Sequence, residues 1–298
     1  GVMDPVARLD EQITDGIVGE VMYPSLSMFT FAIPDAEVRD AAFQQHNDWV
    51  LDYCSVDRNR LIGVGCLPLP DVDRAIAEMD RSASRGVKGF AIPAHVDPAL
   101  PYNDPAFDPF WARAQEHGVP LTMHIFTGQT LDGGLPAHWG TPGGNLKGYT
   151  LAHTTAVNTM IDIICGGVVE RFPQLKFVIS EYETGWVAHT LPRLEHAAYR
   201  TPWELADGLT MKPSEYFDRN FWVTFEDDTE GIATRHEIGV SNLLWGNDYP
   251  HHASIWPNSR PILDDILAGV PGDEREAMVW GNVMDLYEID QDLLPSPA

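Results

Sequence analysis

The chain has 298 residues, of which 44% are hydrophobic and 21% charged, a composition that fills a large core and excludes a disordered peptide. Lys and Arg total 19 against 44 Asp and Glu, so the formal net charge is −25 and nucleic acid is not an expected partner. No stretch approaches the ~20 apolar residues of a membrane span, and no basic-then-apolar leader opens the chain. We therefore expect a cytoplasmic protein with no membrane partner.

Seven short apolar segments bounded by turn residues are predicted strands: 17–23, 61–67, 87–92, 120–126, 176–181, 221–225 and 243–248. Helical patterns alternate with them, at 5–16, 35–57, 71–85, 105–117, 150–171, 185–199, 230–238, 256–268 and 274–286. This alternation predicts a parallel sheet covered by helices, an α/β fold of the TIM (β/α)8 barrel type. No linker or internal repeat is found, so residues 1–298 are expected to form one domain.

The cap residues of several predicted helices also stand out. Asp71 can cap the helix at 71–85, and Gly86 and Gly118 stand just past helix ends, where a left-handed residue is favoured.

A closed barrel of this type has eight strands, whereas seven are predicted here and the chain opens on a helix. We therefore expect the eighth strand, which the sequence does not show, to be the first of the barrel.

Three predicted strands end in polar side chains that could carry chemistry. They are His124, Glu181 and Asp248. Active groups of such barrels sit at the carboxyl ends of the strands, so these three side chains are expected at one mouth. One imidazole and two carboxylates in a dry pocket favour a divalent metal, with Zn²⁺ as the first expectation and Mn²⁺ as the second. The alternative for His124 alone is a hydrogen-bonded core histidine.

Four motifs together resemble those of a known family. They are VPLTMH at 119–124, GVVERFPQLKF at 167–177, WGNDYPH at 245–251 and GNVMDLY at 281–287. With them the chain resembles the metal-dependent amidohydrolase superfamily, in the branch that contains aminocarboxymuconate-semialdehyde decarboxylase and γ-resorcylate decarboxylase. The resemblance implies an enzyme in which His124 is a metal ligand and Asp248 lies at the metal as ligand and proton acceptor. It also implies a small-molecule substrate and a homodimer.

The sequence departs from that family at two places. The family's catalytic histidine is replaced by Glu181, a carboxylate that could bind the metal, act as a base or, with a raised pKa, act as an acid. The His-X-His or Glu-X-His pair of the family's first strand has no counterpart in residues 1–35. Either the chain is a fragment of a longer protein, or residues are missing from it, or its metal site is incomplete. We favour a fragment, because the missing strand and the missing ligands are one element.

The candidate substrate-binding residues surround this mouth: Phe126, Trp139, His251, His252 and Arg260. Trp139 lies in a long glycine-rich segment, 127–148, that is predicted to be a lid, the alternative being a mobile surface loop. The histidines could equally be structural groups, and Arg260 a salt-bridged surface residue. The acidic run 226–228 also follows a predicted strand and is kept as a further candidate.

Three functions stay open at this point. The first is a metal-dependent non-oxidative decarboxylase of a small carboxylated aromatic or unsaturated molecule, which the resemblance favours. The second is a metal-dependent hydrolase of a lactone, ester or amide, in which metal-activated water attacks and Asp248 takes the proton. The third is a catalytically silent barrel that binds a ligand. The catalytic residues expected for either enzyme are Asp248 and Glu181.

Overall fold

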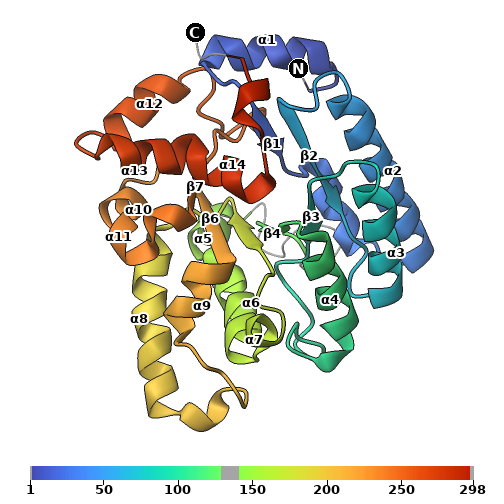
Figure 1. Cartoon of the computed structure of the whole chain (residues 1–298), viewed down its shortest axis with the longest axis vertical. Helices are drawn as coiled ribbons and strands as arrows, with labels where there is room; N and C mark the ends of the chain where they lie inside the picture. Colours follow the sequence, from blue (N-terminus) through green and yellow to red (C-terminus); the bar gives the residue numbers. More distant parts are fainter. Residues whose placement is uncertain (1, 129–140, 296–298) are drawn as a thin grey trace.

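The structure, a computed structural model, describes residues 2–128 and 141–295 and contains a seven-stranded parallel sheet in which the strands follow one another in chain order. The strands are β1 Glu20–Met22, β2 Leu61–Cys66, β3 Gly89–Ile92, β4 Leu121–His124, β5 Phe177–Ser180, β6 Phe221–Phe225 and β7 Leu243–Trp245. Helices surround them on the outside, as in a TIM-type barrel (Figure 1). The predicted fold class is confirmed.

Fourteen α-helices are found in the described ranges. They are α1 Pro5–Asp15, α2 Ala36–Cys54, α3 Val72–Ala83, α4 Asp108–His117, α5 Gly144–Leu151, α6 His153–Cys165, α7 Val168–Arg171, α8 Gly185–Arg200, α9 Pro213–Asn220, α10 Thr229–Ala233, α11 Arg235–Ile238, α12 Ser259–Ile266, α13 Gly272–Glu276 and α14 Asn282–Tyr287. None of these described helices is long and apolar enough to cross a lipid bilayer.

Side chains alternate between two apolar clusters because each strand is buried on both faces. On β4, Leu121 and Met123 join the larger cluster between the sheet and the helices. The smaller cluster fills the inside of the curled sheet and includes Val178 of β5, Leu244 of β7 and Tyr287 of α14. Helix α14 thus supplies an aromatic ring to the interior. On β4 and β5 the inward position at the carboxyl end is polar, His124 and Ser180 respectively.

The sheet ends at β1 and β7, and within the described residues these two strands do not pair with each other. Helix α1 runs across the top of Figure 1, above β1, and bonds to residues on both sides of this seam. Arg8 of α1 donates through Nη2 to Glu20 of β1 and also to the carbonyl oxygen of Tyr249, which follows β7, at 3.0 Å each. The predicted opening helix therefore bridges the two outer strands.

Several predicted caps are confirmed, while some predicted helices were too long. Asp71 accepts from the backbone N–H of Arg74, and Gly118 takes the left-handed conformation. The single helix predicted at 150–171 is three helices, α5 to α7, because Gly167, with φ +76°, turns the chain between α6 and α7. The helix predicted at 274–286 is interrupted by a π-helical turn, Ala277–Gly281. Helix α9 was not predicted.

The three cysteines of the chain form no disulfide with one another. Cys54 and Cys66 are buried, Cys165 is partly buried, and all three are free. Burial raises the pKa of all three thiols, so they are poor nucleophiles.

A buried asparagine joins α2 to the sheet and gives a test of the fold. Asn47 is fully buried; its Oδ1 accepts from the N–H of Cys66 at 2.7 Å, and its Nδ2 donates to the carbonyl of Cys66 at 3.0 Å. We expect Asn47→Ala to lower the free energy of unfolding by about 2–3 kcal/mol, because it orphans buried polar groups. Urea unfolding measures this. The control is Gln45→Ala on the exposed face of the same helix, and an equal midpoint for both variants would contradict the argument.

Candidate metal centre

His124, the last residue of β4, points into the interior and is 5% exposed. Its Nδ1 lies 3.1 Å from the carbonyl oxygen of Ile125, and its Nε2 lies 2.9 Å from Oε2 of Glu181. When Nδ1–H donates to that carbonyl, the neutral ring presents a lone pair at Nε2. A lone pair and a carboxylate at this distance need a proton or a metal cation between them. Burial opposes the charged ring, but the hydrogen bond to Glu181 raises the pKa of His124 overall.

Glu181 follows β5 directly and owes its direction to an unusual backbone. Its φ is +66°, a left-handed conformation that L residues rarely adopt. The N–H of Glu181 donates to Oγ1 of Thr224 on β6 at 2.9 Å. This bond anchors the turn to the neighbouring strand, so the side chain is held toward His124.

Asp248 lies three residues beyond β7 and also has a positive φ, +53°. Its Oδ2 accepts from Nδ1 of His251 at 2.7 Å. Burial, together with the negative charge of Glu181, raises the pKa of Asp248 to about 6. The groups around Asp248 therefore supply too little positive charge to stabilise its ionised carboxylate fully.

Glu181, Asp248 and His251 each offer one ligand atom, and these atoms lie within 4.8 Å of one another. The grouping brings together two of the three predicted ligands, and the third, His124, reaches the group through its contact with Glu181. His251, predicted as a substrate-binding residue, lies inside the cluster. Two carboxylates and two imidazoles are a donor set that suits Zn²⁺ or Mn²⁺.

A second set of carboxylates connects the loops that follow β5, β6 and β7. Glu183 Oε2 accepts from the N–H of Glu226 at 3.2 Å, and Glu226 Oε1 accepts from the N–H of Ile255 at 3.0 Å. Asp228 Oδ2 accepts from the N–H of Thr184 at 2.7 Å. Burial raises the pKa of Glu183 to about 7 and that of Glu226 to about 8. These groups position the loops around the centre.

Two of the predicted substrate-binding residues lie beside the cluster. Phe126, with φ +65°, packs edge to face against Tyr149 of α5, with ring centroids 5.9 Å apart. Burial and the charges of Glu181 and Asp248 raise the pKa of Tyr149, so its hydroxyl interacts electrostatically with these two carboxylates. His252 is exposed, and its ring centroid lies 4.2 Å from that of His251. Tyr149 and Glu183 are residues that sequence reasoning missed.

The remaining two predicted residues have different outcomes. Trp139, and most of the predicted lid, fall outside the described residues. Arg260, on α12, is exposed, and its guanidinium lies so close to Gly16 that a Cβ there would collide with it. Arg260 therefore packs against the end of α1 and is not part of the cluster.

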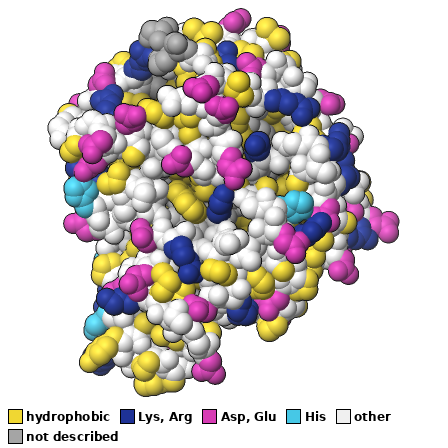
Figure 2. All heavy atoms as spheres, in the orientation of Figure 1, with side chains coloured by type: hydrophobic (Ala, Val, Ile, Leu, Met, Phe, Trp, Pro, Cys, Tyr) yellow, Lys and Arg dark blue, Asp and Glu magenta, His cyan; other side chains and the backbone are white. Residues whose placement is uncertain are grey.

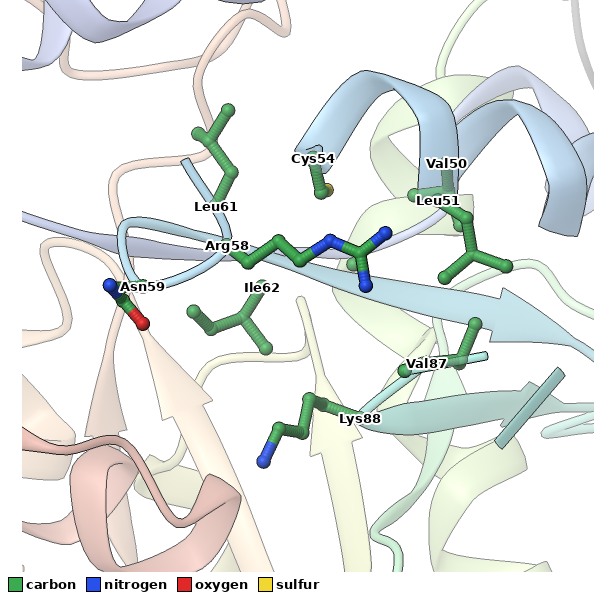
Figure 3. Close-up of a pocket in the computed structure, with 11 residues that line it drawn as sticks. Val50, Leu51, Cys54, Arg58, Asn59, Leu61, Ile62, Val87 and Lys88 are labelled. Carbon is green, nitrogen blue, oxygen red and sulfur yellow. The ribbon is translucent and has the colours of Figure 1, made fainter. Parts of the chain in front are cut away.

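A cavity of about 240 Å³ lies at the opposite end of the sheet (Figure 3). Residues that precede β2 and β3, among them Arg58 and Lys88, line it beside Cys54 of α2. It opens at the amino ends of these strands, whereas the carboxylates converge at the carboxyl ends. On the face shown in Figure 2, Lys and Arg side chains are scattered among Asp and Glu rather than gathered into a patch.

Comparisons with known proteins point to one family. The family model described as Amidohydrolase matches residues 13–289. The chain is 26% identical over 250 residues to a gamma-resorcylate decarboxylase of Rhizobium sp. (strain MTP-10005), covering 78% of this chain and 74% of that protein. It is 28% identical over 293 residues to the 2-amino-3-carboxymuconate-6-semialdehyde decarboxylase of Dictyostelium discoideum, covering 96% and 77%.

Solved structures show the same fold. The 5-carboxyvanillate decarboxylase LigW of Sphingomonas paucimobilis superposes with a TM-score of 0.77 at 23% identity, covering 95% of this chain and 83% of that one. A dihydroxybenzoic acid decarboxylase of Polaromonas sp. JS666, solved with manganese and the inhibitor 2-nitroresorcinol, gives 0.76 at 17% identity, covering 96% and 87%. The match to the family model and the arrangement of the strands agree with the resemblance seen in the sequence, and the chain belongs to the amidohydrolase family.

Proposed function

We propose that this chain is a metal-dependent non-oxidative decarboxylase of a small aromatic or unsaturated carboxylate. The observation that carries the proposal is the convergence of Glu181, Asp248 and His251, with His124 against Glu181, at the carboxyl end of the sheet. The names of the curated relatives support the reaction type, since they include decarboxylases of gamma-resorcylate and of 2-amino-3-carboxymuconate-6-semialdehyde.

The proposed metal ligands are His124, Glu181 and Asp248, and His251 is kept for proton transfer through its hydrogen bond to Asp248. A divalent ion bound there would supply Lewis acidity to the substrate's carboxylate and to an oxygen beside it. Manganese in the structure from Polaromonas sp. supports Mn²⁺ alongside the Zn²⁺ favoured by the sequence. The homodimer and the cytoplasmic location stay predictions from the resemblance and the sequence.

Proton delivery is proposed for the pair formed by Asp248 and His251. Their 2.7 Å hydrogen bond lets them share one proton at the edge of the site. In decarboxylation the bond between the substrate carbon and its carboxyl group breaks, and the electron pair stays on that carbon. The carbon takes the proton from the pair, and CO₂ leaves. Phe126 and Tyr149 provide an apolar wall for the substrate's ring.

Metal binding is the first test. We expect the purified protein to bind about one Mn²⁺ or Zn²⁺ per chain. Asp248→Asn should weaken binding about a hundredfold or more and abolish turnover with the fold intact, because a ligand charge is lost. Calorimetric titration with Mn²⁺ measures affinity, and circular dichroism measures the fold. Asp265→Asn, an exposed change on α12, is the control. Absence of binding to the wild-type chain would favour the silent barrel.

Substrate class is the second test. A panel of hydroxybenzoates and lactones separates the two enzyme hypotheses, because only decarboxylation releases CO₂. We expect CO₂ from at least one hydroxybenzoate and no opening of the lactones. Lactone hydrolysis without CO₂ release would instead establish the hydrolase.

The aromatic wall is tested on whichever hydroxybenzoate reacts. Phe126→Ala should raise KM about tenfold with little change in kcat, because it removes apolar contact with the ring that the ground state and the transition state share. The control is Tyr199→Ala, a change at an exposed tyrosine of α8. A KM unchanged by Phe126→Ala would remove Phe126 from the binding site.

A further inference from the structure

Helix α1 holds both neighbours of Asp248. Asp15, its last residue, accepts through Oδ2 from Nδ2 of Asn247 at 3.0 Å. Arg8, about two turns earlier, donates through Nη2 to the carbonyl oxygen of Tyr249 at 3.0 Å. Asn247 and Tyr249 directly precede and follow Asp248. Two side chains more than 230 residues away in the sequence thus form hydrogen bonds to the residues on either side of Asp248.

We propose that Asp15 and Arg8 are positioning residues that direct the carboxylate of Asp248 toward Glu181. The inference rests on the proposed function in that Asp248 is taken as a metal ligand. It goes beyond that function by assigning a role to a helix that contributes no ligand of its own to the centre.

The burial of both charged side chains supports this role. Asp15 is 3% exposed and Arg8 is 6% exposed. Buried charges are costly unless they are paired or hydrogen-bonded, and here Arg8 is paired with Glu20 while Asp15 accepts hydrogen bonds from Asn247 and Ser259. Asp15 Oδ1 accepts from the N–H of Ser259 at 2.9 Å, Oδ2 also accepts from the hydroxyl of Ser259, and Arg8 pairs with Glu20 on β1. Asp15 thus binds the loop after β7 and the first residue of α12, and Arg8 binds that loop and β1.

The turn at Asp248 needs such support. A φ of +53° at a residue other than glycine costs about 1–3 kcal/mol, and it persists only when surrounding contacts impose it. Strand β7 ends three residues earlier, and within the described residues its outer edge pairs with no other strand. The sheet therefore fixes Asp248 from one side only.

Asn247 connects the helix to the turn. Its Oδ1 accepts from the N–H of Tyr249 at 3.2 Å, a bond that spans Asp248, while its Nδ2 donates to Asp15. Because one amide group makes both bonds, the acceptor at Asp15 sets which way that amide points. Loss of this acceptor leaves Nδ2 only a 3.5 Å contact with the hydroxyl of Ser259, so the amide is held less firmly and the turn loses part of its support.

A purely structural role for α1 makes a different prediction. In that case Asp15→Asn would lower thermal stability but leave the centre unchanged at temperatures where the protein stays folded. The variant keeps the shape of Asp15 but only one acceptor oxygen, so it can accept from the backbone N–H of Ser259 or from Nδ2 of Asn247, which bind different oxygens of Asp15, but not from both.

The experiment measures Mn²⁺ affinity of the full chain by calorimetry, well below the unfolding temperature. We expect Asp15→Asn and Asn247→Ala each to weaken binding about tenfold, the effect typical of groups that orient metal ligands. The double variant should be no weaker than Asn247→Ala alone, because both changes remove the same bond. Asp10→Asn, the same chemical change on the exposed face of α1, is the matched control and should bind as the wild type does.

A second measurement does not depend on metal. The ring ¹⁵N shifts of His251, assigned by comparison with His251→Gln, report its hydrogen bond to Asp248 in the metal-free protein. We expect these shifts to change in Asp15→Asn and in Asn247→Ala and to stay unchanged in Asp10→Asn.

The outcomes separate the two proposals. If the wild-type chain binds no Mn²⁺, the proposed function fails, and the His251 shifts alone decide the positioning role. If Asp15→Asn does not fold, Asn247→Ala carries the test, because it leaves Asp15 bonded to Ser259. Wild-type Mn²⁺ affinity or wild-type His251 shifts in the folded variants would overturn the inference.

Discussion

Glu181 and Asp248 face each other at the carboxyl end of the sheet, with ligand atoms within 4.8 Å, and the arrangement of the site follows from their repulsion. At an effective dielectric constant of about 20, two unit charges at that distance repel by about 3 kcal/mol. Each carboxylate has an imidazole against it, His124 for Glu181 and His251 for Asp248. Burial and the charge of Glu181 raise the pKa of Asp248, and the hydrogen bond to Glu181 raises that of His124. A divalent cation bound here would supply the positive charge that these carboxylates lack.

Backbone strain is concentrated where the chemistry is proposed. Phe126, Glu181 and Asp248 follow three different strands, and all have φ between +53° and +66°. Each of these turns carries a side chain that a regular continuation of the strand would have aimed differently. The cost of about 1–3 kcal/mol at each residue is offset by bonds such as the one from Glu181 to Thr224.

The sequence predicted the strand order and much of the site because both depend on local patterns. Apolar runs located all seven strands, and the rule for barrel mouths selected His124, Glu181 and Asp248. Five of the seven strands were predicted to run past their carboxyl ends, whereas β3 and β6 end where predicted. At β5 the reason is that nothing in the residue types indicates a positive φ at Glu181. Tyr149 was missed because its place over the mouth depends on how α5 packs, and Arg260 packs beside Gly16 for a similar long-range reason.

Each loop around the centre is held by hydrogen bonds from side chains of another element. These bonds explain how strained turns can keep their side chains in a defined direction. Glu183 binds the loop after β6 through Glu226, and Glu226 in turn binds the loop after β7 at Ile255. On its other side that last loop has no neighbouring strand among the described residues, and the bonds of α1 take the place of a strand's. Every turn that carries a proposed ligand is thus fixed by a side chain from a different element. The geometry of the proposed ligands then depends on all of these hydrogen bonds, including those from α1, a helix at the other end of the sequence from Asp248.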